Sequence, residues 1–505
     1  MKTLQHVVQR FLSQWYFPLA LILLSSNTFA TNTIQSIESN IDDLSCTGCN
    51  LILLNMDFFR ADYVGFPDSA SITPNIDNFF KNSIKFENTY STSGSSYRSG
   101  LSILTSTNPH IYDLDVRSFE ILKRKHSLGR WKKIYSSAKS IAEILQSTGY
   151  HTIQYNKGTR SGRTTYLDRG FSVYRQFVIR TLIEEIVPDF GDLLLESQQP
   201  YLGLLHAVPT RLHRAYYPAN RTRLDHPNIQ YRPFNKNGKI HGYVVARNWG
   251  VSHHEQREAE HHIYQQQLQY ADDELELLFR KLKQHEDSSI IVLYSGHGTQ
   301  IGDKQIYASN GVSYESNIRV PLLIKHPSIN APVHISQRVS LIDLAPTLLD
   351  MLGIESPKSF LGKSLVPLIE GKNSTQRVIY GRNDPDEFII VGNWKLIAKN
   401  YVTKELFNIF EDPNKINNLY KKHKYIARLL EYRPSPGKYI DIVDPKEWQL
   451  VIQNDTQYEL YDLQNDPGEL TNLIDEQQEI FQPMLEEMHK KKAAAQKDIA
   501  RMSTQ

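Results

Sequence analysis

The chain has 505 residues, of which 40% are hydrophobic and 22% are charged, a composition typical of folded globular proteins. Its 57 Lys and Arg residues nearly balance its 55 Asp and Glu residues, and the formal net charge is +2. This nearly equal number of positive and negative side chains argues against nucleic acid as the main partner. Beyond the N-terminus no long apolar run occurs, which excludes a polytopic membrane protein.

Residues 1–30 have the pattern of a secretory signal peptide. Lys2 and Arg10 supply a positive region, a short apolar run covers 17–24, and Thr28 and Ala30 occupy the small-residue cleavage positions. Because the run is too short to span a bilayer, cleavage is favoured over the alternative of an uncleaved anchor. We therefore expect an exported protein, periplasmic or secreted, with no stable membrane span after cleavage.

The two cysteines, Cys46 and Cys49, follow this segment. In an exported chain a Cys-x-x-Cys pair is expected to close a small disulfide loop. A redox role, the alternative, would place the pair at the start of a helix, whereas the apolar residues 50–56 indicate a strand.

Short apolar runs alternate with helical patterns through the central part of the chain. The run at 50–56, bounded by Gly48 and Asp57, is apolar enough for a strand buried on both faces. Helical spacing of apolar residues indicates helices at 140–145 and 264–282. Further strands are predicted at 150–155, 201–205, 289–294 and 320–324. This alternation predicts an α/β fold: a large mixed, mostly parallel sheet sandwiched by helices.

Polar side chains stand at the ends of three of these predicted strands. They are Asp57, His206 and the segment Ser295-Gly296-His297. Ligands of parallel sheets gather at the carboxyl ends of the strands, so the candidate site is expected there.

One predicted helix carries several histidines. Over 253–262, His254, Glu258 and His262 share one helical face, which suggests a metal site. However, Glu258 stands where a His-Glu-x-x-His motif needs its second histidine. A solvated, charged helix face is therefore favoured.

The C-terminal part contains a repeat. Trp394-Lys-Leu-Ile, Glu405-Leu-Phe-Asn and Asp412-Pro recur 54 residues later as Trp448-Gln-Leu-Val, Glu459-Leu-Tyr-Asp and Asp466-Pro. We expect each copy to form a short hairpin and an Asp-Pro turn, within a small α+β subdomain with an antiparallel sheet at 376–480. The lysine-rich stretch at 481–505 is predicted to be a helical, solvated tail.

An ordered series of segments resembles the sulfatase family, within the alkaline-phosphatase superfamily. It covers about residues 48 to 475 and includes Asn50 to Asp62, Thr73-Pro-Asn-Ile-Asp77, Asp168-Arg-Gly-Phe171, Ser295-Gly-His-Gly298 and Tyr314-Glu-Ser-Asn-Ile-Arg-Val-Pro321. The resemblance implies a sulfatase-like catalytic-type domain at 46–375. It also implies a hydrolase that acts on a small-molecule or glycan sulfate or phosphate ester.

Sulfate-ester chemistry needs a nucleophile, a divalent cation and cationic side chains around an anion. Carboxylates at strand ends would hold a hard cation, with calcium expected. The metal ligands that the resemblance implies are Asp57, His297 and Ser96. The catalytic residues that it implies are Ser96, His297, Lys157, Arg98 and His206.

The nucleophile segment departs from the family pattern, which is Cys/Ser-x-Pro-Ser-Arg ahead of Leu-Thr-Gly. Anchoring on Leu104-Thr105 places Ser96 where the family carries a Cys or Ser that is oxidised to formylglycine. Arg98 then stands in place of the proline and Gly100 in place of the arginine. Because the modifying machinery recognises that proline and arginine, an unmodified Ser96 is the alternative to formylglycine.

Other family positions are also replaced in this chain. Phe58 and Gly296 stand where the family has metal carboxylates, and Asn310 stands where it has a substrate-binding lysine. Thr159 and Thr210 stand in place of family histidines. His206 and His213 lie near Thr210 in the sequence and are candidates to substitute for the histidine that Thr210 replaces.

Three functions therefore stay open. The first is an exported hydrolase of sulfuric esters. The second is a catalytically inactive binding protein that keeps the fold, because fold alone does not determine function. The third is a phosphoester or phosphonate hydrolase that uses unmodified Ser96.

Overall fold

The computed structural model describes residues 43–64, 71–108, 138–157, 167–177, 181, 183–197, 200–210, 217–218, 229–233, 240–245, 252–306, 311–372, 377–383, 386–408 and 448–504. The predicted signal peptide lies outside these residues, as do Thr159, His213 and Asn310. Within the described ranges, no helix is both long enough and apolar enough to cross a membrane.

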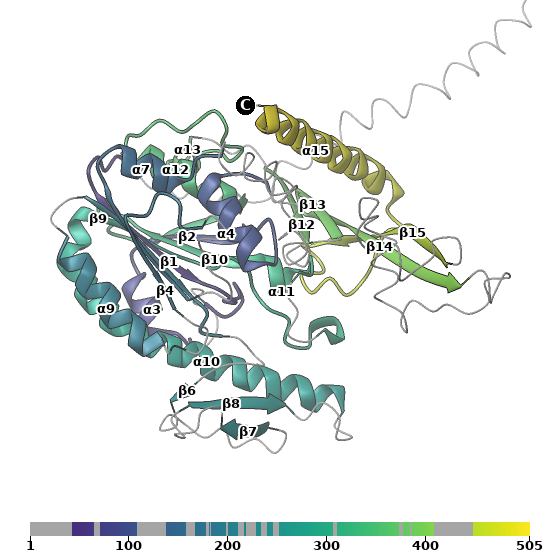
Figure 1. Ribbon diagram of the computed structural model, residues 1–505, viewed down its shortest axis with the longest axis horizontal. Coiled ribbons are helices and arrows are strands. Elements are labelled where there is room, and N and C mark those ends of the chain that lie inside the picture. The colour runs from purple at the N-terminus through teal and green to yellow at the C-terminus, as the bar shows by residue number, and fades with distance from the viewer. Residues whose placement is uncertain are drawn as a thin grey trace, which may run out of the picture. The chain divides into compact units, whose positions relative to one another are not determined.

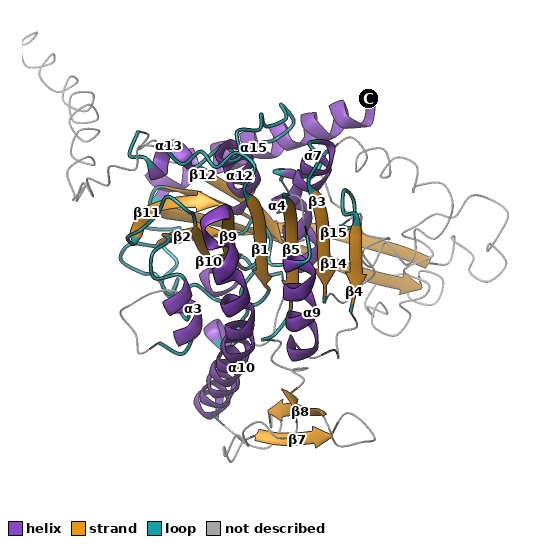
Figure 2. Cartoon of the chain, turned by 90° about the vertical axis from the view of Figure 1, so that its left-hand side faces the viewer, coloured by secondary structure: helices purple, strands orange, loops and turns teal. Residues whose placement is uncertain are grey.

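Eight strands form the central sheet, in the order β11-β2-β10-β9-β1-β5-β3-β4 (Figure 2). Only β10 runs antiparallel to its neighbours within this sheet, which confirms the prediction of a mixed, mostly parallel sheet. The strands are β1 (Asn50–Met56), β2 (Ile84–Tyr90), β3 (His151–Asn156), β4 (Val173–Gln176), β5 (Tyr201–Ala207), β9 (Ser289–Tyr294), β10 (Arg319–Lys325) and β11 (Val333–Ser340).

Strand β1 lies at the centre of the sheet and is buried on both faces. Leu51 and Leu53 pack into one hydrophobic core, and Ile52, Leu54 and Met56 pack into the other. Because successive side chains point to opposite faces, a strand covered on both sides must be apolar at nearly every position. This explains the continuous run in the sequence.

Helices cover both faces of the sheet (Figure 1). The core that contains Ile52 is closed by α3 (Pro74–Phe79), α9 (Ile183–Leu195) and α10 (His253–Leu282). The core that contains Leu51 is closed by α4 (Ser96–Thr105), α7 (Ile141–Ser147), α12 (Leu344–Met351) and α13 (Val366–Ile369). The predicted helical sandwich is therefore confirmed.

Helix α10 begins earlier than the apolar spacing indicated. Ser252 and Glu255 form a capping box at its N-terminus, which extends the helix back through the histidine-rich run. His254 pairs with Glu258 at 3.5 Å, and these side chains are 79% and 61% exposed. The prediction of a solvated, charged face is confirmed for this pair.

The C-terminal subdomain has a four-stranded antiparallel sheet, β12 (Val378–Asn383), β13 (Asp386–Val391), β14 (Trp394–Asn408) and β15 (Trp448–Asp462). Each copy of the repeat supplies one 15-residue strand, and the two strands pair with Trp394 opposite Asp462. The predicted hairpin within each copy is wrong, because residues 398–404 contain no Gly or Pro to turn the chain. The two copies instead form one long antiparallel pair of strands, β14 and β15.

Helix α15 (Gln478–Thr504) confirms a C-terminal helix, but its first half is not a solvated tail. Phe481, Met484 and Met488 are buried against the apolar face of the C-terminal sheet.

A further small antiparallel sheet consists of β6 (Tyr217–Pro218), β8 (Ile240–Val245) and β7 (Ile229–Pro233). The predicted disulfide between Cys46 and Cys49 is present, just ahead of β1.

Candidate active site

Four of the predicted site residues lie at one edge of the central sheet. Asp57 follows β1, Lys157 follows β3, His206 is the penultimate residue of β5, and His297 comes three residues after β9. These four strands are mutually parallel, with β1 between β5 and β9. Their carboxyl ends therefore bring the four side chains to the same edge.

Ser96 contacts His297 directly. It is the first residue of α4, and its Oγ lies 3.0 Å from His297 Nε2. His297 Nδ1 lies 2.7 Å from the carbonyl oxygen of Gly298, which can only accept a hydrogen bond. Nδ1 therefore carries a proton, and in a neutral ring Nε2 is an available acceptor for the Ser96 hydroxyl, which is also a hydrogen-bond partner of Asp57. This is the arrangement of a nucleophile and its general base.

Phe58 holds the other side of the His297 ring. Its own ring packs edge-on to the imidazole, with centroids 4.5 Å apart, and its N–H donates to the His297 carbonyl at 2.8 Å. Phe58 has a positive φ of 72°, uncommon for a bulky residue, and the Tyr264 hydroxyl donates to its carbonyl at 2.7 Å. Phe58 thus helps to fix the position of the histidine ring.

Asp57 is fully buried and is hydrogen-bonded to His206. Its Oδ2 lies 2.8 Å from His206 Nε2, while its Oδ1 accepts from the Gly296 N–H at 3.1 Å. The other ring nitrogen of His206 lies 2.8 Å from Asn156 Oδ1, so both ring nitrogens face oxygens. Burial by itself would raise the pKa of Asp57. The opposing effects of His206, His297 and Ser96 are larger together, so the pKa of Asp57 is lowered. Asp57 is therefore an ionised carboxylate.

Lys157 and Arg98 are the two cationic side chains predicted for this site. Lys157 is 5% exposed, its backbone N–H donates to the His206 carbonyl at 2.8 Å, and burial lowers its pKa to about 8. Arg98 is buried on α4, two residues after Ser96, and residues two apart on a helix do not face one another. The roles of Lys157 and Arg98 toward an anion stay predictions.

The residues present do not fit the expected calcium ion. Both oxygens of Asp57 already accept hydrogen bonds, and a Cβ at Gly296 would lie 2.5 Å from Asp57 Oδ1, which leaves no room for a second carboxylate. Within the described part of the chain, no three His, Cys, Asp or Glu side chains are grouped to hold a metal ion. Calcium takes about six to eight oxygen ligands. The metal role of Asp57, Ser96 and His297 stays a prediction without support from these contacts, and we derive no step through a metal.

Sequence reasoning missed two asparagines in this site. Asn156 holds the second nitrogen of His206, and Asn55 Oδ1 accepts from the Gly296 N–H at 2.9 Å. Asn156 directly precedes Lys157 at the end of a strand, and Asn55 is the one polar residue inside the apolar run of β1. A buried amide at the end of a strand was the available signal for both.

Curated relatives match parts of this chain. The "Extracellular sulfatase SULF-1 homolog" of Drosophila melanogaster is 35% identical over 127 residues, which are 25% of this chain and 11% of the relative. Human "Arylsulfatase K" is 29% identical over 163 residues, 29% of this chain and 30% of the relative. The matched region thus spans less than a third of the length of either relative.

Solved structures share the fold over most of this chain. A protein crystallised with its substrate, D-glucosamine-2-N,6-O-disulfate, has a TM-score of 0.58 and 16% identity, with 89% of this chain and 99% of that chain covered. The phosphonate monoester hydrolase of Agrobacterium radiobacter has a TM-score of 0.56 and 16% identity, with 88% and 96% covered. At such identities the likeness shows the fold alone.

Two family models match the sequence. The model described as "N-sulphoglucosamine sulphohydrolase, C-terminal" matches residues 303–432, which include part of the C-terminal subdomain. The model described as "Sulfatase" matches residues 49–354, which contain the whole central sheet together with Asp57, Ser96 and His297. The chain belongs to the sulfatase family.

Proposed function

We propose that this protein hydrolyses sulfuric esters with Ser96 as the nucleophile and His297 as the general base. The observation that carries the proposal is the 3.0 Å contact between Ser96 Oγ and His297 Nε2 at the N-terminus of α4. Membership of the sulfatase family supports the substrate class. A helix N-terminus also favours an anion, because its backbone N–H groups point outward.

The reaction then has two balanced steps. In the first, Ser96 Oγ attacks the sulfur of R–O–SO₃⁻, and His297 takes the serine proton and passes it to the departing oxygen, which leaves as ROH. In the second, His297 takes a proton from water, the resulting hydroxide attacks the sulfur of the sulfoserine, and hydrogen sulfate leaves while the proton returns to Ser96. The proposed anion ligands are Lys157 and Arg98, while His206 is proposed to orient the buried Asp57, because both of its ring nitrogens are already bonded to Asp57 and Asn156.

The proposed substrate is a sulfated glycan or a related small ester outside the cytoplasm. Two relatives are named as extracellular sulfatases, and one solved neighbour was crystallised with a sulfated amino sugar. The signal-peptide pattern over residues 1–30 supports export of this chain.

A phosphoester or phosphonate hydrolase is the second candidate. It is favoured by Arg98 and Gly100, which stand where the family signal for formylglycine has its proline and arginine. An unmodified serine is a workable nucleophile for phosphoryl transfer.

Turnover of 4-nitrophenyl sulfate and 4-nitrophenyl phosphate by the purified protein tests the proposal. Faster turnover of the sulfate supports it, whereas turnover of the phosphate alone supports the second candidate. Absence of turnover with either ester would reject both. The mass of the peptide that contains Ser96 adds a separate result, because formylglycine lowers it by about 2 Da.

We expect turnover to be independent of calcium. Asp57 gives both of its oxygens to hydrogen bonds, so the protein should bind less than about 0.1 calcium per chain and lose no activity in EDTA. Elemental analysis and an assay after chelation measure this. Activity that disappears in EDTA and returns with calcium would show instead that Asp57, Ser96 and His297 bind a metal.

The affinity for an anionic ester should fall above about pH 8. Burial lowers the pKa of Lys157 to about 8, so its side chain is a cation below this pH and is neutral above it. Loss of a charge-assisted hydrogen bond is expected to raise KM about 10- to 100-fold. Measurement of KM from pH 6.5 to 9.5 follows the change.

Two variants control this pH dependence. Lys157→Met should have the high KM at every pH, and Lys139→Met, at an exposed position, should behave like the wild type. A KM that rises above pH 8 equally in Lys157→Met would assign the titration to another group.

A further inference from the structure

The loop that leads into α4 is held by the C-terminal subdomain. Ser93 and Gly94, which precede Ser96 by three and two residues, are completely buried or nearly so. The N–H of Gly94 donates to Asn383 Oδ1, and Ser93 Oγ donates to the same oxygen at 3.2 Å. Asn383 is the last residue of β12 and is 1% exposed. A side chain from the second subdomain thus binds the backbone just ahead of the nucleophile.

The amide of Asn383 is fixed at both ends. Its Nδ2 donates to the carbonyl of Val312 at 2.9 Å and to Ser313 Oγ at 3.2 Å. Because the amide oxygen faces an N–H and the amide nitrogen faces a carbonyl, its orientation is determined. The backbone of β12 adds a bond to the same loop, since the N–H of Arg382 donates to the Thr92 carbonyl at 2.8 Å.

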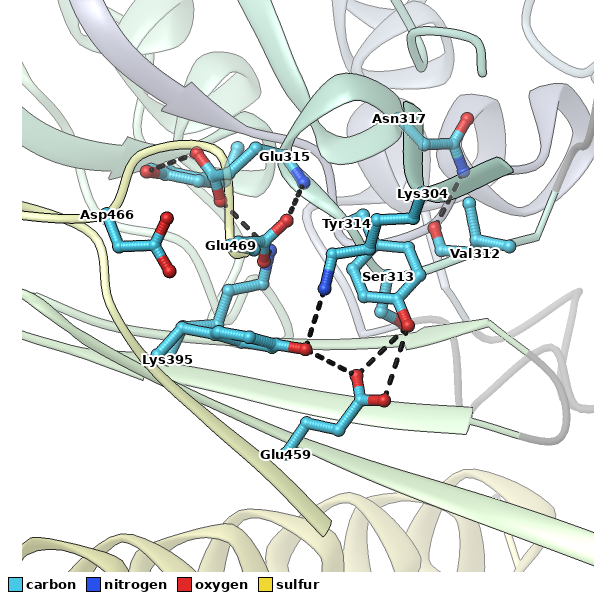
Figure 3. A network of polar contacts seen from close by, with 12 residues as sticks. Lys304, Val312, Ser313, Tyr314, Glu315, Asn317, Lys395, Glu459, Asp466 and Glu469 are labelled. Atoms are coloured by element: carbon cyan, nitrogen blue, oxygen red, sulfur yellow. Dashed lines mark hydrogen bonds and ion pairs between the residues drawn. The ribbon is translucent and has the colours of Figure 1, made fainter. Parts of the chain in front are cut away.

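The segment bound by Asn383 Nδ2 also supports the other half of the catalytic pair. Asn317 Nδ2 donates to the Val312 carbonyl at 2.7 Å (Figure 3), and the N–H of Gly298 donates to the Asn317 carbonyl at 2.8 Å. The carbonyl of Gly298 in turn accepts from His297 Nδ1. Asn383 therefore lies between the loop that carries Ser96 and the segment that holds His297.

Space around the loop is fully occupied. A Cβ at Gly94 would lie 1.9 Å from Asn317 Nδ2, and the N–H of Gly311 donates to the Gly94 carbonyl at 3.0 Å. The loop can therefore move only if the groups that contact it move too.

We propose that Asn383 is a positioning residue for the reaction, which sets Ser96 Oγ against His297 Nε2 from the C-terminal subdomain. The inference rests on the proposed function for its catalytic meaning. It assigns the subdomain a part in catalysis: alignment of the nucleophile, without contact to the substrate. A misplacement of about 1 Å between reacting groups lowers rates about 100-fold.

The test compares Asn383→Ala with Asn393→Ala. Asn393 lies in the same subdomain, in the turn between β13 and β14, where its Oδ1 accepts from Arg338 at 2.8 Å. We expect Asn383→Ala to lower kcat about 10- to 100-fold with KM changed less than about twofold. The control variant should keep both constants. A kcat in Asn383→Ala equal to that of the control would overturn the proposal.

Hydrogen–deuterium exchange gives a readout that needs no turnover. The peptide over residues 91–98 should exchange faster in Asn383→Ala than in the wild type or Asn393→Ala, because the Gly94 N–H loses its acceptor. If the wild type hydrolyses no ester, the proposed function fails, and this exchange result alone decides whether Asn383 holds the loop. Unchanged exchange would reject the inference. Should the alanine variant not fold, Asn383→Ser serves instead, since its shorter side chain cannot reach both Gly94 and Val312.

Discussion

Ester hydrolysis by the Ser96→Ala variant is expected to fall at least about 1,000-fold in kcat. Ser96 Oγ is the atom that His297 Nε2 contacts at 3.0 Å, and alanine removes it. The loss should be the same for sulfate and phosphate esters, since both candidate reactions use this oxygen. KM should change little, because the proposed anion ligands Lys157 and Arg98 remain in place. Steady-state kinetics with both aryl esters measure the two constants.

Ser95→Ala is the matched control for this experiment. Ser95 is the N-cap residue of α4, but its side chain makes no capping hydrogen bond, so its replacement should change kcat less than about twofold. Full activity of Ser96→Ala would remove the serine from the mechanism. Wild-type inactivity toward every ester, together with an intact fold, would favour the binding-protein alternative instead.

Burial on both faces leaves a local signal, which was sufficient to predict five of the eight strands of the central sheet, β1, β3, β5, β9 and β10, but not β2, β4 or β11. β1 and β9 are apolar at most positions, and a polar residue, Asp57 or Ser295, follows each of them. The antiparallel direction of β10 left no comparable signal, because its run Val320 to Ile324 is as apolar as those of the parallel strands. The pairing of the two repeat copies was also hidden, since strand pairing depends on contacts distant in sequence.

Site residues that belong to a local sequence motif could be predicted, whereas partners that only the folded chain brings together could not. The resemblance to the family implied Asp57, Ser96 and His297 as site residues, and the structure brings them together, while their catalytic roles stay predictions. Asn156 and Asn383 act on His206 and Gly94, from which they are separated by 50 and 289 positions. No local pattern marks such partners. The sequence also could not show that a side chain at position 296 lacks space, because only the folded structure places the Asp57 carboxylate beside Gly296.

The largest expected effect on stability concerns Lys395, on strand β14. Its side chain is completely buried and pairs with Glu315 at 2.9 Å and Glu469 at 2.7 Å (Figure 3). Burial by itself would lower the pKa of Lys395, but the two carboxylates outweigh it and raise that pKa. Lys395→Met leaves the carboxylates close together without a cation, so the free energy of unfolding should fall by about 3–5 kcal/mol. Urea denaturation at pH 7 measures the loss.

Arg280→Met provides the comparison, because Arg280 pairs with Glu276 at 3.7 Å while 64% and 49% of the two side chains are exposed. Such a pair is worth less than about 1 kcal/mol.

Burial, together with Glu315, raises the pKa of Glu469, so the folded state holds a proton on this group more tightly than the unfolded state does. Without Lys395 that preference grows, and stability then increases as the pH falls, so the loss should be smaller at pH 5 than at pH 7. A loss as small as that of Arg280→Met, or one independent of pH, would mean that water reaches the two carboxylates and screens their repulsion.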